Sequence, residues 1–139
     1  MINILFIMLD LISGLITNTY FNLCFIIIIS VHRKYKRFNY SIFVFFLGLI
    51  YDLTISGLPF MYSFLYLVIY FLAHGIRNLN IYTIYIISIV TFMFLNYLML
   101  IPFSNVNFNI LFLIKTLLIN LFIFHIVYNF YKCIYINRW

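Results

Sequence analysis

The chain is 139 residues long, 68% hydrophobic and only 7% charged, with a formal net charge of +6. A soluble domain carries about 25% charged residues because its surface faces water. The composition therefore excludes soluble enzymes, nucleic-acid-binding domains and disulfide scaffolds, and it predicts an integral membrane protein. At about 20 residues per spanning helix, the chain holds at most five or six spans in a single membrane domain.

Polar or helix-breaking residues divide the chain into six apolar segments, and each is expected to form a membrane helix. The segments cover residues 2–16, 20–31, 40–55, 60–74, 81–101 and 108–131. We therefore expect an all-α integral membrane protein, a compact bundle of about six transmembrane helices. The first segment lacks the basic start of a secretory signal and is expected to be retained. Fusion of the first two segments into one helix stays open, although the polar triplet 17–19 suits a turn.

The basic residues are segregated along the predicted topology. Four of the eight Lys and Arg lie in the loop 33–37, and others lie at Arg77 and in the C-terminal tail. The loops expected on the opposite side contain neither Lys nor Arg: 17–19, 56–59 and 102–107. Because basic loops stay in the cytoplasm, this distribution predicts six spans with both termini cytoplasmic.

Three charged residues lie inside the predicted spans: Asp10, Asp52 and Lys115. A rise of about 1.5 Å per residue places all three in the outer half of the membrane. Each charge alone costs about 2.5–3.5 kcal/mol at mid-membrane, so we predict an ion pair between Lys115 and either Asp52 or Asp10. The alternative is that Lys115 extends to the membrane surface while Asp52 caps a neighbouring helix end.

The sequence contains no pattern that indicates catalysis, a metal site or another cofactor. His32, His74 and His125 are not spaced as metal ligands on one helix, and no Ser-x-x-His or His-Glu pattern occurs. Each histidine is expected to be a hydrogen-bonded structural residue. Cys24 and Cys133 lie far apart, without CxxC spacing. We therefore expect a protein that is not an enzyme and needs no cofactor.

The most specific stretch joins the third and fourth segments. Gly48 and Asp52 are four residues apart and share one helix face, where the missing side chain of Gly48 would let another helix approach the acid. Gly57 and Pro59 are then expected to end the span. The alternative is a generic helix end with an interfacial aspartate.

At these residues the chain resembles the rod shape-determining protein MreD family. Members of that family carry a Gly-Leu-x-x-Asp motif late in a membrane helix, followed by a small-residue and Pro turn and another apolar helix. The matching residues here are Gly48, Leu49, Asp52, Gly57 and Pro59. The resemblance extends to the basic loops and the final apolar helix. The chain departs from the family pattern at two positions, Met61 and Phe64, where Gly and another small residue are usual.

The resemblance implies a non-enzymatic scaffold in the bacterial cytoplasmic (inner) membrane that takes part in cell elongation, rod shape and peptidoglycan synthesis. MreD-like proteins partner MreC and, through it, the actin-like MreB, the RodA glycosyltransferase and a class B penicillin-binding protein. Their fold is similar to that of the substrate-binding subunits of energy-coupling-factor vitamin transporters. Asp52 and its turn would shape a helix-packing surface or a small outward pocket for the partner.

Two other functions stay open. A substrate-binding subunit of an energy-coupling-factor transporter would share the fold, but such subunits carry Ala-rich stripes on their first helix, and this chain has one alanine, Ala73. A holin-like or toxin pore former fits the length. It is disfavoured because no span carries a strongly amphipathic polar stripe.

Overall fold

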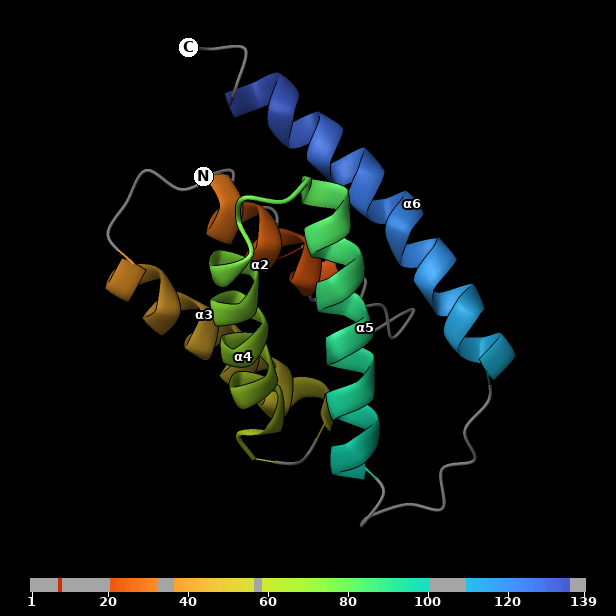
Figure 1. Ribbon diagram of the computed structural model, residues 1–139. Coiled ribbons are helices and arrows are strands. Elements are labelled where there is room, and N and C mark those ends of the chain that lie inside the picture. The colour runs from red at the N-terminus through yellow and green to blue at the C-terminus, as the bar shows by residue number, and fades with distance from the viewer. Residues whose placement is uncertain (1–7, 9–20, 33–36, 57–58, 101–109, 136–139) are drawn as a thin grey trace.

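The computed structural model describes residues 8, 21–32, 37–56, 59–100 and 110–135, and the elements in these ranges are helical (Figure 1). This confirms the all-α prediction. The first predicted span, 2–16, lies outside the described residues except for Met8. The elements are α2 (Phe21–His32), α3 (Arg37–Tyr51), the π-helical turn η1 (Asp52–Ser56), α4 (Met61–Gly75), α5 (Ile81–Leu100) and α6 (Ile110–Tyr135).

Two helices of the described ranges, α5 and α6, are long and apolar enough to cross a membrane. They contain 20 and 26 residues, which correspond to lengths of about 30 and 39 Å. Helices α2, α3 and α4 have 12 to 15 residues and rise only about 18 to 23 Å, less than the hydrocarbon core of about 30 Å. Each shorter helix occupies a segment that the sequence predicts to be apolar and helical.

Helix α4 lies in the middle of the fold and packs against α2, α3 and α5. Helix α6 lies along the outside of this group and contacts α2 and α5 (Figure 1). Its first turns, coloured light blue in Figure 1, diverge from α5. Helix α4 is thus central, whereas α3, which packs mainly against α4, and α6 lie at the edges of the described bundle (Figure 1).

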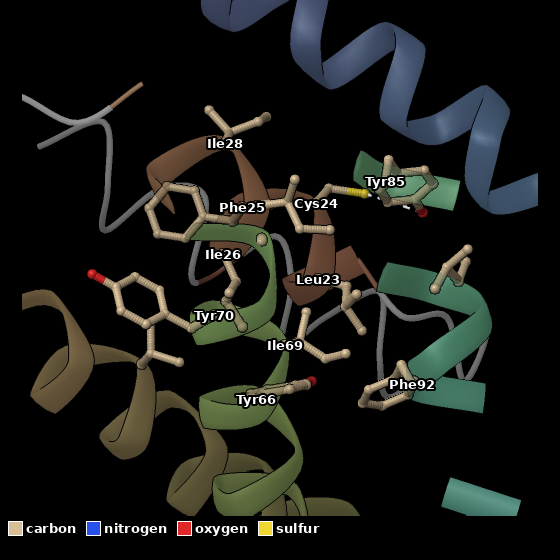
Figure 2. Packing of buried hydrophobic residues seen from close by; sticks show 14 of the residues in the cluster. Leu23, Cys24, Phe25, Ile26, Ile28, Tyr66, Ile69, Tyr70, Tyr85 and Phe92 are labelled. Carbon is tan, nitrogen blue, oxygen red and sulfur yellow. Dashed lines mark hydrogen bonds between the residues drawn. The ribbon is translucent and has the colours of Figure 1, made fainter. Parts of the chain in front are cut away.

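The core is centred on α2, whose residues 22–28 are all buried. A helix that is apolar around its whole circumference lies in a protein core or spans a membrane, and α2 lies in the core. Here Leu23 and Ile26 face a layer formed by Tyr66 and Ile69 of α4, and Phe92 of α5 lies beside that layer (Figure 2). Close van der Waals packing of these large side chains stabilises the contacts between the helices.

Tyr85 joins three helices. Its ring stacks on Phe124 of α6 with the ring centroids 4.1 Å apart, and its hydroxyl donates to the backbone oxygen of Asn120 at 3.2 Å. The thiol of Cys24 on α2 lies 3.6 Å from the same hydroxyl oxygen (Figure 2). A buried tyrosine needs such a partner for its hydroxyl, and these contacts fix α2, α5 and α6 in register.

The outer faces of α5 and α6 expose large apolar side chains. Phe94 is 61% exposed, Leu111 77% and Phe122 67%. A contiguous apolar surface of this kind is typical of contact with lipid or with another protein. It agrees with the membrane character that the composition predicts.

Candidate functional site

The candidate site is the joint between α3 and α4, defined here by Gly48, Asp52, Tyr62 and Ser63. Asp52 directly follows α3 and begins the π-helical turn η1. Turns of this type insert an extra residue into a helix and occur frequently at functional sites. The turn places the Asp52 side chain on the side of the chain that faces α4.

The Asp52 carboxylate caps the start of α4 across the joint. One oxygen accepts the backbone N–H of Tyr62 at 2.7 Å, and the other accepts the backbone N–H of Ser63 at 3.2 Å and its hydroxyl at 2.8 Å. The first N–H groups of a helix have no partner within the helix and attract negative charge. Asp52 supplies both the acceptors and the charge from another helix.

The residue before α4 explains why the cap comes from elsewhere. Phe60 occupies the N-cap position, has no side-chain acceptor and makes no capping hydrogen bond. Its φ of 63° places it in the left-handed region, an uncommon conformation for a bulky residue. The turn from η1 into α4 is therefore strained at Phe60 and held by Asp52.

Gly48 allows the two helices to approach at the joint. A Cβ placed on Gly48 would lie 2.6 Å from the backbone nitrogen of Ser63 and closer still to its Cα. No side chain fits there unless the backbone of α4 moves. Gly48 and Asp52 therefore share one helix face, and α4 lies close to the acid at that face.

Aromatic rings cover the joint. Tyr51 and Tyr62 pack with their centroids 4.8 Å apart, and both pack against Tyr66, which stacks on Phe92 at 6.0 Å. Asp52 itself is only 3% exposed. The carboxylate is buried and accepts hydrogen bonds from three donors of α4, so it fixes how the two helices meet. This arrangement is the helix-capping alternative that the sequence analysis left open.

The other predicted site residues lie in different environments. Leu49 is half-buried on α3, and Pro59 is exposed just before α4. Lys115 is exposed on α6 and makes no ion pair within the residues that the structure describes. Gly57 and Asp10 lie outside the described residues. The ion pair of Lys115 with Asp52 or Asp10 stays a prediction.

Sequence reasoning missed Tyr62 and Ser63 of the joint, and it also missed Phe60, which precedes α4. Ser63 is the third residue of α4 and the only small polar residue in that apolar helix. A small polar residue at such a position indicates close packing and hydrogen bonding between helices. Phe60 offers no such signal, because a bulky aromatic residue is not expected at positive φ.

The histidine and cysteine predictions concern residues outside the α3–α4 joint. His125 is hydrogen-bonded, with Tyr82 Oη 2.8 Å from its Nδ1 and Asn129 Nδ2 2.9 Å from its Nε2. Cys24 is buried and Cys133 exposed, and neither forms a disulfide with another described residue. Among the described residues, no three His, Cys, Asp or Glu side chains gather closely enough to hold a metal ion.

No protein-family model, curated protein or solved structure matches the chain.

Proposed function

We propose that the chain is a non-enzymatic scaffold of the bacterial cell-elongation machinery, in the manner of the MreD family. It would sit in the cytoplasmic membrane as a six-span protein with both termini in the cytoplasm. Its partners would be an MreC-like protein and, with it, a RodA-like glycosyltransferase, a class B penicillin-binding protein and, indirectly, MreB. No cofactor enters this function.

The α3–α4 joint carries the proposal. The residues that resemble the family motif, Gly48 and Asp52, meet the first turn of α4 in one closely packed unit. The unit is buried, and its carboxylate is bound to backbone and hydroxyl donors. A motif of this kind sets the angle between two membrane helices, and a scaffold depends on such a fixed surface to recognise a partner.

The distribution of charge supports the topology. Lys132 lies near the end of α6, and Arg77 lies in the turn between α4 and α5. Since consecutive antiparallel spans alternate in direction, both residues fall on the same side of a membrane, together with the basic loop 33–37. The three shorter helices would span by recruiting flanking residues or by locally thinning the bilayer.

Crosslinking in membranes of the native host, followed by affinity purification of the tagged chain and mass spectrometry, tests the function. Recovery of an MreC-like protein or cell-wall synthases is the expected result. The Asp52→Ala variant should recover less of that partner than Gly75→Ala at equal protein level, because only the former disturbs the joint. Recovery of paired ATPases with a membrane coupling subunit would instead identify a transporter subunit and overturn the scaffold proposal.

Cysteine labelling tests the topology separately. We expect a cysteine at position 18 to react with a membrane-impermeant maleimide added to intact spheroplasts. Native Cys133 is the matched control, because it should react only after lysis if the C-terminus is cytoplasmic. Protection of position 18 before lysis, with reaction afterwards, would favour the fused first helix and a smaller number of spans.

A further inference from the structure

A cluster of polar side chains joins the first turn of α5 to the second half of α6. His125 lies between Tyr82 and Asn129, with its Nδ1 2.8 Å from Tyr82 Oη and its Nε2 2.9 Å from Asn129 Nδ2. The Tyr82 ring also stacks on the His125 ring, with the centroids 6.0 Å apart. The cluster is separate from an apolar groove between α5 and the first half of α6, which is lined by residues such as Val90 and Leu117.

Lys132 completes this polar cluster on one face of α6. Residues 125, 129 and 132 have the spacing i, i+4 and i+7, which places their side chains on the same side of a helix, and all three are exposed. Lys132 makes no hydrogen bond or ion pair with the other described residues. Its ammonium therefore adds a positive charge beside the imidazole and the amide.

The hydrogen-bonding capacity that the cluster leaves unused consists mainly of donors. In one arrangement of the neutral imidazole, Nδ1 donates to Tyr82 and Nε2 accepts an amide N–H of Asn129, so the Tyr82 O–H and the second amide N–H have no further partner among the described residues. In the other arrangement the amide is turned, Tyr82 donates to Nδ1 and the Asn129 oxygen accepts from Nε2, which leaves both amide N–H groups unused. Either arrangement leaves two donors near the Lys132 ammonium, and such a set favours an anionic acceptor.

The cluster lies at the depth of lipid headgroups if α5 and α6 cross a membrane. Lys132 is about 33 Å along α6 from its start at Ile110, just beyond a hydrocarbon core of about 30 Å. Tyr82 is the second residue of α5, at the end of that helix where a tyrosine ring suits the membrane interface. The acceptor that meets these donors at this depth is the phosphate of a phospholipid.

From these observations we propose that Tyr82, His125, Asn129 and Lys132 bind the phosphate of an anionic phospholipid in the leaflet nearest the C-terminus. The unused donors of the cluster hydrogen-bond the phosphate oxygens, and the Lys132 ammonium favours a headgroup with net negative charge over one that carries its own ammonium. The proposal rests on α5 and α6 crossing a membrane and is independent of a role in cell elongation.

Native mass spectrometry tests the proposal on the full chain, purified in a neutral detergent with equal amounts of phosphatidylglycerol and phosphatidylcholine. The wild type should retain phosphatidylglycerol in preference. Lys132→Gln should lower the ratio of phosphatidylglycerol to phosphatidylcholine about fivefold, the effect expected of one lysine at an anionic lipid surface. Lys115→Gln is the matched control, because Lys115 is also exposed on α6 but lies near its other end. Equal effects of the two variants would overturn the proposal.

Asn129→Leu tests the donors without a change of charge. It should reduce retention of phosphatidylglycerol severalfold, because the amide supplies an unused donor in both arrangements of the imidazole. Thr116→Val is its control, since it also replaces a polar group of α6 by an apolar one of similar size, far from the cluster. Undiminished retention by Asn129→Leu would show that the cluster only joins α5 to α6, and would overturn the site.

Inorganic phosphate distinguishes a lipid from a soluble phosphate compound. Its addition should displace no more phosphatidylglycerol than sodium chloride at the same ionic strength. Selective displacement by phosphate would assign the site to a free phosphate compound and overturn the lipid as its ligand. A requirement for detergent to extract the protein tests the membrane location by itself.

Discussion

The backbone of Ser63 lies against Gly48 so closely that a side chain on the glycine would meet the Ser63 nitrogen at 2.6 Å. This approach brings the first N–H groups of α4 to the carboxylate of Asp52, which begins η1 one helical turn after Gly48. Packing and capping are therefore parts of the same contact. Loss of either should loosen the same joint.

Gly48→Ala should destabilise the protein by about 1–3 kcal/mol, since the added methyl group forces the α4 backbone outward. Gly75→Ala is the matched control, because a Cβ at Gly75 meets no atom within 4 Å. Thermal unfolding followed by circular dichroism in detergent measures both. Equal melting temperatures for the two variants would show that the contact at Gly48 does not limit packing.

Asp52→Ala should leave the N–H groups of Tyr62 and Ser63 without their acceptors. Each buried donor left unpaired costs about 1–3 kcal/mol. Ser63→Ala removes only the hydroxyl bond of 2.8 Å and should cost about 1 kcal/mol. Comparison of the unfolding midpoints of the two variants tests whether Asp52→Ala loses more stability than Ser63→Ala. A larger loss of stability in Ser63→Ala would contradict the capping role of Asp52.

Phe60→Gly should be more stable than Phe60→Ala by about 1 kcal/mol, because glycine adopts a φ of 63° without steric cost. Both variants remove the exposed ring, so the difference between them reports the backbone alone. The melting temperatures of the two variants, measured under the same conditions, test this difference in stability. Equal stability would mean that the turn relaxes when the ring is removed.

Ser88→Ala should leave the stability unchanged or raise it by up to about 1 kcal/mol. The Ser88 hydroxyl is fully buried and has no hydrogen-bond partner among the described residues, so its removal relieves a desolvation cost. Ser30→Ala is the control, because its hydroxyl donates to Ile27 O at 2.8 Å and its loss should destabilise. A clear loss of stability in Ser88→Ala would show that this hydroxyl is hydrogen-bonded.

A double-mutant cycle tests the predicted ion pair. From the exposed position of Lys115 and the bonds of Asp52 to α4, we expect Lys115→Ala and Asp52→Ala to be additive within about 0.5 kcal/mol. Additivity would rule out the pair between Lys115 and Asp52, whereas the pair with Asp10 needs the corresponding cycle with Asp10→Ala. A larger coupling free energy would establish the pair with Asp52.

The sequence by itself determined the helical class and the place of the described helices. A chain this apolar must satisfy its backbone polar groups internally, so long apolar runs become helices. Glycine, proline and polar residues between those runs set the boundaries of α4 and α5 to within about one residue. The spacing of Gly48 and Asp52 also determined that they share a face, since residues four apart lie one above the other on a helix.

Only the tertiary structure decided which helix meets that face. Helical periodicity places Asp52 on the same face as Gly48, but it carries no information that Ser63, eleven residues later, will donate hydrogen bonds to Asp52. The left-handed Phe60 and the apolar groove between α5 and α6 likewise arise from how the chain turns and where α6 diverges from α5. These features depend on contacts between helices, and composition and periodicity describe each helix alone.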